Sequence, residues 1–224
     1  MTPERFAKLR ARLDRRQPDL TVLAENTHKT HNIAAMLRTA DAVGLFTVHA
    51  VFETTEFRHH HRVAGGARKW VNLTLHDSTR AATDELQGGG FRLLAAHPGV
   101  DAIDYREIDY TQKTALVMGS ELDGISDDAA SAVDAFVSIP MEGMGASLNV
   151  SVAAALLLYE ARRQREVASL YDHCRISPAV YEQTLFEWAY PDLATRCRQK
   201  KRPYPALGTD GELLSNPLAN TSPA

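Results

Sequence analysis

The sequence has little cysteine, no long apolar run and no glycine-rich nucleotide fingerprint. Its two cysteines, Cys174 and Cys197, lie outside the apolar centre of the 224-residue chain. A disulfide framework is therefore not expected, whereas a reducing, cytoplasmic location is. No apolar stretch approaches the roughly 18 residues of a membrane-spanning helix. The start of the chain is too charged for a secretory signal, so neither secretion nor membrane insertion is predicted.

Glycine clusters at one place where a phosphate-binding loop could be suspected, residues 88–90. A dinucleotide fingerprint follows a strand and precedes a helix. These glycines instead follow a helix expected over 79–86 and precede a strand expected over 91–97. They are interpreted as a helix cap and a turn, so any nucleotide-like cofactor must be bound by other means.

The apolar runs that do occur alternate with helical patterns as far as residue 165. Their residues are apolar throughout rather than at every second position, which indicates a parallel sheet covered on both faces. We therefore expect an α/β fold with a mostly parallel six-stranded sheet and helices on both faces. Strands are expected over 20–23, 47–52, 70–75, 91–97, 114–118 and 135–140, and helices over 3–16, 32–43, 79–86, 127–133, 148–165, 178–188 and 193–201.

Two segments lack such patterns and are expected to be irregular. Residues 98–113 are predicted to form an acidic loop anchored by Ile103, Tyr105 and Ile108. The tail from Pro203 onward is rich in Pro, Gly and Asn and is expected to fray.

Three adjacent histidines at positions 59–61 raise two alternatives, a metal site and a solvated loop. Neighbouring side chains in such a run point in different directions, which makes them a poor chelator. We favour a solvated loop or helix start, and no metal site is predicted.

Positive charge gathers toward the two ends of a chain whose net charge is −3. Residues 1–20 hold six Lys and Arg against three Asp and Glu, and residues 162–202 hold nine against five. Residues 21–161 hold ten against eighteen, so the middle is acidic. Basic patches can attract a phosphate backbone. On charge alone, however, solvated helix faces are the favoured explanation.

The first of three polar constellations is residues 31–44. Asn32 is expected to N-cap a helix that Gly44 ends. Arg38 lies at the edge of the apolar stripe of this helix, an unusual place for an unpaired charge. A solvated or ion-paired surface arginine is the alternative. The stripe consists of Ile33, Met36, Leu37, Ala40 and Val43.

The other two constellations follow predicted strands, at the edge where open α/β folds bind ligands. Gly119 and Glu121 end one strand, and Glu121 could equally be a turn carboxylate. Ser147 is expected to N-cap a long helix that begins at Leu148, with Asn149 in its first turn. The expected apolar face of that helix is Leu148, Val152, Ala155, Leu156 and Tyr159.

Taken together and in this order, the constellations resemble the motifs of the SpoU branch of the SPOUT-class RNA 2′-O-ribose methyltransferases. The segments RRQPDLTVLAENTHK, REIDYTQK, LFEWAYP and KKRPYP resemble members that methylate guanosine 18 in the tRNA D-loop, over nearly the whole chain. The chain departs from many relatives at Ala34, where they carry Gly, and in the variable loop 142–146. The matching residues are Asn32, Arg38 to Ala40, Gly119, Glu121, Gly124, Ile139 to Met141 and Ser147 to Ser151.

The resemblance implies a cofactor, a knotted fold and a dimer. The cofactor is S-adenosylmethionine, bound in a C-terminal deep trefoil knot within roughly residues 91–165. The methyltransferase domain is expected over 20–165, between a basic helical extension, 1–19, and a C-terminal tRNA-binding extension, 166–224. A homodimer is expected to form through the long helix that follows Ser147. The implied cofactor-binding residues are Ala96, Met118, Gly119, Ile139, Met144 and Leu148.

The resemblance also implies roles for polar residues. Arg38 is expected to be essential, either as the base for the ribose 2′-OH or by holding an RNA phosphate that takes the proton, because arginine stays protonated. Asn32 and Glu121 would position Arg38 or the ribose, and Ser147 and Asn149 would shape the pocket. The implied tRNA contacts are Arg5, Lys8, Arg12, Arg16, Arg196, Lys200 and Lys201.

These implications predict a tRNA guanosine-18 2′-O-methyltransferase. A 2′-O-methyltransferase of rRNA or of the anticodon loop is one alternative. A catalytically silent, knotted RNA-binding dimer is another, although intact Asn32, Arg38, Glu121 and Asn149 count against it. For Tyr204, stacking on a base and packing within the protein both stay open.

Overall fold

The computed structural model describes most of the chain. Glu121 and the three histidines at 59–61 lie outside the described residues. The chain forms two compact units, Gln17–Asp172 and the combination of Met1–Arg16 with His173–Ala224. Within the described part of the chain, no helix is both long and apolar enough to cross a bilayer. The described residues are 1–27, 29–52, 69–99, 101–120, 122–145 and 147–217.

A seven-stranded sheet forms the centre of the larger unit. Its strands are β1 Leu20–Glu25, β2 Thr47–Val51, β3 Asn72–His76, β4 Arg92–Ala96, β5 Ile103–Asp104, β6 Thr114–Met118 and β7 Ala135–Ser138. Neighbouring strands all pair in parallel, in the order β3-β2-β1-β6-β4-β7-β5. The predicted parallel sheet is confirmed, and the carboxyl ends of its strands lie along one edge.

The predicted number of six strands is wrong by one. The additional strand, β5, lies inside the segment 98–113 and pairs with the end of β7. Its two residues are too few to show any periodicity in a sequence. Within the same segment Ile108 is buried as expected, but Ile103 is 37% exposed, and the fully buried Tyr110 is an anchor that the sequence did not reveal.

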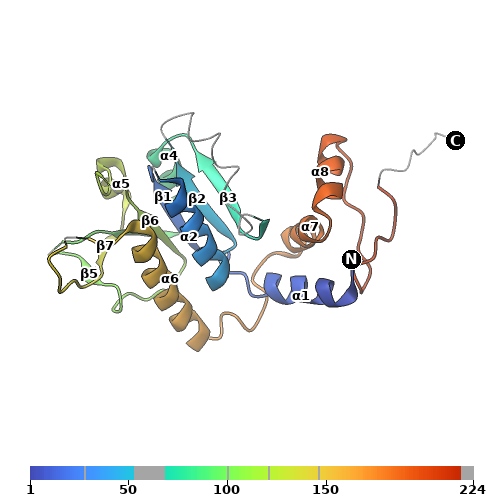
Figure 1. The fold of residues 1–224 in the computed structure, drawn as a ribbon, viewed down its shortest axis with the longest axis horizontal. Helices are drawn as coiled ribbons and strands as arrows, with labels where there is room; N and C mark the ends of the chain where they lie inside the picture. The colour runs from blue at the N-terminus through green and yellow to red at the C-terminus, as the bar shows by residue number, and fades with distance from the viewer. Residues whose placement is uncertain (28, 53–68, 100, 121, 146, 218–224) are drawn as a thin grey trace. The chain divides into compact units, whose positions relative to one another are not determined.

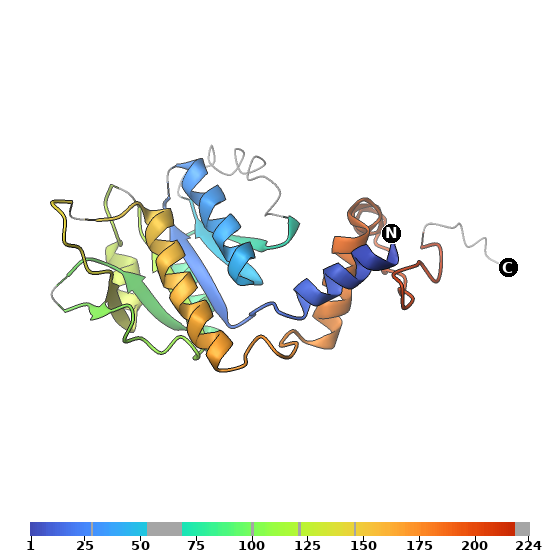
Figure 2. The ribbon, with the colours of Figure 1, turned by 60° about the horizontal axis from the view of Figure 1, so that its bottom comes forward.

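Helices cover both faces of this sheet, as predicted (Figures 1 and 2). They are α2 Thr30–Val43, α4 Thr79–Gly88, α5 Asp127–Ala132 and α6 Val150–Val167. α2 and α6 lie side by side on one face and share the larger apolar core with the strands. α4 and α5 pack over a smaller core on the other face. Both faces of the central strands are therefore dry, which explains their apolar composition.

The prediction for α2 is right for its buried face and its end but wrong for its cap. The stripe from Ile33 to Val43 is buried, and Gly44 follows the helix with a φ of 87°, a conformation that favours glycine. The helix begins at Thr30, so Asn32 lies inside it rather than at the N-cap, and is 1% exposed.

The start of α6 differs from the prediction, and the core is met by a different apolar face from the one that periodicity marked. The N-cap is Asn149, not Ser147, because the Asn149 side chain accepts a hydrogen bond from the Ser151 amide at 2.9 Å. The apolar face marked by periodicity is largely exposed: Val152, Leu156 and Tyr159 are 48%, 39% and 48% exposed. The residues that enter the core are Val150, Ala154, Leu157, Leu158 and Ala161.

Arg165, which a basic stretch suggested to be solvated, is fully buried at the end of α6. Its guanidinium forms an ion pair with Asp19 at 2.7 Å. It also donates to the Gln17 side chain at 3.0 Å and to the carbonyls of Tyr110 and Gln112 at 2.8 and 2.9 Å. This one side chain thus joins α6 to the segments that precede β1 and β6.

The smaller unit combines both ends of the chain. Its helices are α1 Pro3–Leu13, α7 Pro178–Ala189 and α8 Pro191–Gln199. α1 packs against α7 and buries Phe6, Leu9 and Leu13. The predicted fraying from Pro203 is not observed as far as Pro217. The Tyr190 hydroxyl donates to the Gly211 carbonyl at 2.7 Å, and Leu207 pairs with Leu213 in a β-bridge.

Candidate active site

A cavity of about 520 Å³ lies at the carboxyl edge of the sheet, where β4, β6 and β7 end and α6 begins. Parallel strands deliver their carboxyl ends to one edge, so three loops distant in sequence converge here. Its lining includes Lys29, Ala96 to Pro98, Met118 to Ser120, Leu122 to Ile125, Val137, Ile139, Met141, Ser147 to Val150 and Ala153.

Most of the predicted cofactor-binding residues line this cavity. Ala96 comes from β4, Met118 and Gly119 from the end of β6, and Ile139 and Leu148 from the segment between β7 and α6. Met144 does not, because its side chain is fully exposed. Residues missed from the sequence include Pro98 and Asp123, which carry no periodic signal because they follow strands in irregular loops.

The loop after β6 depends on close backbone approach at Gly119. A Cβ atom at Gly119 would lie 2.2 Å from the Gly124 carbonyl oxygen, far inside van der Waals contact. The Ser120 amide donates to that same oxygen at 2.8 Å, and Gly124 has a φ of 73°. A compact turn therefore forms one side of the cavity, and glycine is required at both of its ends.

A buried carboxylate, Glu25, fixes the far end of this loop. Its side chain accepts from the Ser126 hydroxyl at 2.5 Å, the Ser126 amide at 3.1 Å and the Thr79 hydroxyl at 2.6 Å. Ser126 in turn N-caps α5 by accepting from the Ala129 amide. Glu25 lies beyond the strand expected over 20–23, and a single acidic residue that ends an apolar run was the available signal for this role.

The first and third constellations meet through two asparagines. The Asn149 amide group donates to the Asn32 side-chain oxygen at 3.2 Å, while the Asn149 oxygen accepts from the Ser151 amide and hydroxyl. Asn149 therefore caps α6 and links it to α2 with one side chain. Ser147 is exposed beside it and lines the cavity.

Arg38 is exposed on α2 and does not line the cavity. Among the described residues its guanidinium has no hydrogen-bond or ion-pair partner, which leaves the charge available for a ligand. Glu121, predicted beside it, lies outside the described residues. One unit of this chain thus brings Asn32, Asn149 and the cavity together, but does not place Arg38 in the same cavity.

The predicted tRNA contacts fall on the smaller unit. All of them are exposed except Arg16. Arg16 is 3% exposed, and its guanidinium lies 5.2 Å from the centre of the Trp188 ring. A packing role fits that position better than a phosphate contact. The exposed ones are Arg5, Lys8, Arg12, Arg196, Lys200 and Lys201.

One group of possible metal ligands occurs within the described part of the chain, His49, His76 and Glu85. The two buried imidazoles share a hydrogen bond between His49 Nδ1 and His76 Nε2 at 2.9 Å. A Glu85 oxygen lies 3.8 Å from His76 Nδ1. Burial, with His76 as the next cause, lowers the pKa of His49 to about 4, so this side chain is neutral at physiological pH. The facing nitrogens are already satisfied by one another.

Models of one protein family account for nearly all of the chain. The SpoU rRNA Methylase family matches residues 19–159, and the C-terminal region of SpoU rRNA methylases matches residues 163–216. The second match covers α7 and α8, so the similarity extends beyond the sheet that carries the cavity.

Individual proteins are similar over much of their length. The tRNA (guanosine(18)-2′-O)-methyltransferase of Escherichia coli strain K12 is 45% identical over 215 residues, 95% of this chain and 94% of the relative. The crystal structure of the A. aeolicus TrmH/SpoU tRNA modifying enzyme superposes with a TM-score of 0.77 at 37% identity, covering 85% of this chain and 97% of that one. The SpoU methyltransferase AviRb from Streptomyces viridochromogenes, solved with the cofactor AdoMet, has a TM-score of 0.59 at 28% identity, covering 68% and 59%.

Proposed function

This chain belongs to the SpoU rRNA methylase family, and we propose that it methylates the ribose 2′-OH of guanosine 18 in the D-loop of tRNA. The observation that carries the proposal is the 45% identity to the E. coli guanosine-18 enzyme over 95% of this chain. The similarity to this enzyme therefore extends beyond the sheet and the cavity, which relatives that act on other RNAs also possess. The methyl donor is S-adenosylmethionine.

The residues around the cavity fit this cofactor. The volume of about 520 Å³ lies within the range of about 300–1,000 Å³ typical of small-molecule sites. Met118, Ile139 and Leu148 offer apolar surface, and the compact turn at Gly119 brings backbone amides and carbonyls to the wall. Bound S-adenosylmethionine supplies a methyl group that its sulfonium makes electrophilic. We assign binding to these residues and Ala96, and we withdraw Met144.

The polar residues around the cavity would position the ribose rather than react covalently. Arg38 would bind an RNA phosphate, which would accept the proton of the 2′-OH, since a guanidinium is too weak a base to take that proton itself. The same guanidinium would stabilise the negative charge that develops on the 2′ oxygen as the methyl group is transferred to it. Asn32, held by Asn149, would orient Arg38 or the ribose. Ser147 would border the cofactor and the RNA, and Glu121 keeps its proposed orienting role.

We further propose a homodimer in which each cavity is completed by Arg38 of the other copy. Two observations support it: Arg38 does not line the cavity of its own chain, and α6 carries an exposed apolar stripe, Val152, Leu156 and Tyr159. Burial of that stripe against a second copy would remove a large apolar patch from water.

The family resemblance further supports a knotted domain with an extension at each end. The methyltransferase domain would span 20–165, and roughly residues 91–165 of it would form the deep trefoil knot. The extensions would be 1–19 and 166–224. The exposed cations of those extensions would bind the tRNA backbone. A cytoplasmic location fits the tRNA substrate and the two free cysteines. The tRNA-contact set keeps Arg5, Lys8, Arg12, Arg196, Lys200 and Lys201 and loses the buried Arg16.

The test is methyl transfer from labelled S-adenosylmethionine to unmodified tRNA, followed by mapping of the labelled nucleotide. A matched tRNA with adenosine at position 18 is the control. Label at guanosine 18 and none in the control tRNA is expected. Label at another tRNA nucleotide would show that guanosine 18 is not the methylated site. Label on rRNA alone would favour an rRNA 2′-O-methyltransferase. Absence of transfer to any RNA would overturn the enzymatic function.

A further inference from the structure

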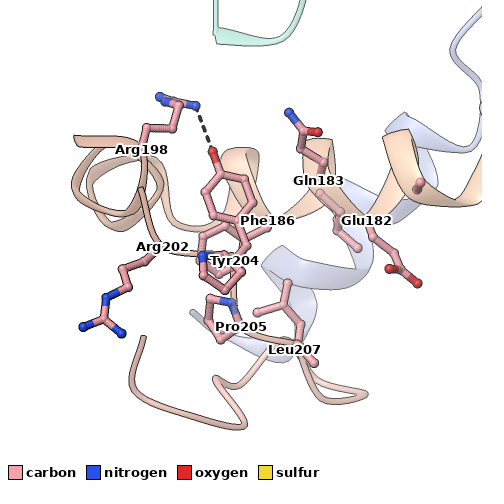
Figure 3. Close-up of a pocket in the computed structure, with 12 residues that line it drawn as sticks. Glu182, Gln183, Phe186, Arg198, Arg202, Tyr204, Pro205 and Leu207 are labelled. Atoms are coloured by element: carbon pink, nitrogen blue, oxygen red, sulfur yellow. Dashed lines mark hydrogen bonds between the residues drawn. The ribbon is translucent and has the colours of Figure 1, made fainter. Parts of the chain in front are cut away.

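A second cavity, of about 680 Å³, lies wholly within the smaller unit, between α7, α8 and the segment that follows α8 (Figure 3). The chain reverses at Lys201, whose φ of 50° ends the helix. The Lys201 amide donates to the Arg198 carbonyl and the Arg202 amide to the Cys197 carbonyl, the two bonds of a Schellman cap. This turn directs residues 203–207 back along α7 and so creates the cavity.

The walls of the cavity include a rigid apolar surface. The Tyr204 ring stacks on the Phe186 ring, with centroids 4.5 Å apart and an interplanar angle of 21°. Pro203 and Pro205 flank Tyr204 and restrict its backbone. Leu207 lies close to Pro205 in Figure 3. Tyr204 therefore packs within the protein, yet it still lines the cavity, so the two roles considered for it are compatible.

A hydrogen-bond network holds this aromatic pair in place. The Tyr204 hydroxyl donates to the Glu187 carboxylate at 2.8 Å, and Arg198 donates to Glu187 at 2.9 Å and to the Tyr204 oxygen at 3.1 Å. Burial and the bond to Glu187 raise the pKa of Tyr204, which keeps its proton in the network. Arg198 is therefore already committed within the protein.

The remaining polar groups at the cavity differ in charge between its two sides, and Gln183 among them also donates to Glu187 at 3.3 Å, which leaves its side-chain oxygen and one N–H for a ligand. In Figure 3, Arg202 lies on one side of Tyr204 and Pro205, whereas Glu182 and Gln183 lie on the other. Within the described part of the chain, the Arg202 guanidinium has no hydrogen-bond or ion-pair partner. The same holds for Lys200 and Lys201, which directly precede Arg202 in the chain, so three successive cations without a partner in the described residues lie where the chain enters the cavity wall.

We propose that this cavity binds one unstacked nucleotide of the RNA substrate. The phosphate would bind Arg202, the flat face of the base would lie on the Tyr204–Pro205 surface, and the base edge would exchange hydrogen bonds with Gln183 and Glu182. Each part of a nucleotide then meets a complementary group: a cation for the anion, an apolar surface for the ring and an amide and carboxylate for ring N–H and C=O groups. The volume suits one nucleotide.

The inference rests on the proposed function for the identity of the ligand as RNA, but it has its own test. The full-length protein is titrated with nucleoside monophosphates, with the parent nucleosides and with inorganic phosphate, and NMR shifts are recorded. Monophosphates are expected to shift the Gln183 side-chain amide and the backbone of residues 203–207. Shifts that inorganic phosphate reproduces in full, or no shifts in this cavity, would overturn the proposal.

A neutral substitution separates base contact from simple charge attraction. Gln183→Ala is expected to raise the KM for tRNA roughly tenfold, the scale of one lost base contact, with kcat and the salt dependence of binding unchanged. Gln199→Ala, at an exposed position of α8 outside the cavity, is the matched control and should have no effect. Equal KM values for Gln183→Ala and wild type, with both proteins melting alike, would contradict the nucleotide site. Methyl transfer at guanosine 18 would then still support the proposed function.

Discussion

Arg38 combines two properties that rarely occur together: it lies beside a buried helical stripe, and its charge has no partner within the described residues. Such a cation suits an anionic ligand that binds from outside the chain. Met118 and Leu148 line the cavity, whereas Arg38 does not. We therefore assign Arg38 no part in cofactor binding.

Arg38→Ala is therefore expected to lower kcat for methyl transfer by about 10²–10³-fold, the usual cost of removing one group that stabilises developing charge. The Kd for S-adenosylmethionine should not change, because Arg38 does not line the cavity. Isothermal titration and single-turnover assays check the two expectations. Arg80→Ala, an exposed arginine on α4, is the control for loss of charge alone. Loss of cofactor binding together with activity would show that the assigned role is wrong.

His49 gives the protein a defined response to acid. Its pKa is about 4 in the folded protein and near 6.5 in the unfolded chain, mainly because burial disfavours the imidazolium. Between these values the unfolded chain binds a proton that the folded protein does not. The free energy of unfolding is thus fully retained above pH 6.5 and falls as the pH drops toward 4, by at most about 3 kcal/mol from this residue.

His49→Gln should flatten that pH dependence, because glutamine does not titrate. Urea unfolding of both proteins between pH 7 and pH 4.5 measures the difference in slope. Carboxylates contribute equally to both proteins, so only the comparison is diagnostic. Parallel curves for the two proteins would show that folding does not lower the pKa of His49.

At the scale of elements, α6 is held at both ends by polar side chains rather than by its apolar stripe alone. Asn149 caps its start and Arg165 anchors its last turn to Asp19 and to carbonyls of two loops. Because the cavity begins where α6 begins, these contacts also position Ser147 and Leu148.

Arg165→Met is expected to lower the free energy of unfolding by about 3–5 kcal/mol, since it removes the ion pair with Asp19 and the donor to the Tyr110 carbonyl within the protein. Arg163→Ala is the matched control on the same helix. Its ion pair with Glu160 is solvent-exposed on the arginine side, so a loss below about 1 kcal/mol is expected. Chemical denaturation measures both values, and similar losses for the two variants would contradict the anchoring role.

The loop after β6 offers a second test at this scale. Gly119→Ala would push a methyl group against the Gly124 carbonyl, 2.2 Å away, and the turn would have to open into the cavity. We expect weaker binding of S-adenosylmethionine, measured by titration, with little change in tRNA binding. Gly145→Ala is the control, because no atom lies near a Cβ there and its φ is not positive. Unchanged cofactor affinity in Gly119→Ala would remove this turn from the proposed site.

At the scale of the whole molecule, the proposed dimer would account both for the exposed stripe on α6 and for the position of Arg38 outside the lining of its own cavity. Leu156→Asp should convert the proposed dimer to a monomer in sedimentation experiments, because burial of a carboxylate in an apolar interface is costly. Methyl transfer should fall with it. Val180→Asp, at an exposed apolar residue on α7 rather than on α6, should leave the dimer intact. A wild-type protein that sediments as a monomer would refute the dimer directly.

Helices and strands with a local sequence signal could be predicted from the sequence alone. Continuous apolar runs such as β6 predicted the parallel sheet, since strands buried on both faces need apolar residues at every position. The stripe of α2 and its end at Gly44 followed from helical periodicity and from the left-handed conformation that glycine accepts. The three constellations and the segments around them were sufficient to indicate the family.

Features that depend on contacts between residues distant in the sequence could not be predicted, and they are visible only in the tertiary structure. Periodicity showed that α6 has apolar faces but not which of them meets the sheet, and the face marked by Val152 and Leu156 proved to be the exposed one. The burial of Arg165 depends on partners up to 148 positions away. The convergence of Ala96, Met118 and Leu148 on one cavity depends on the order in which the strands pair. Long-range contacts of this kind leave no periodic trace, because each follows from how elements pack rather than from their own composition.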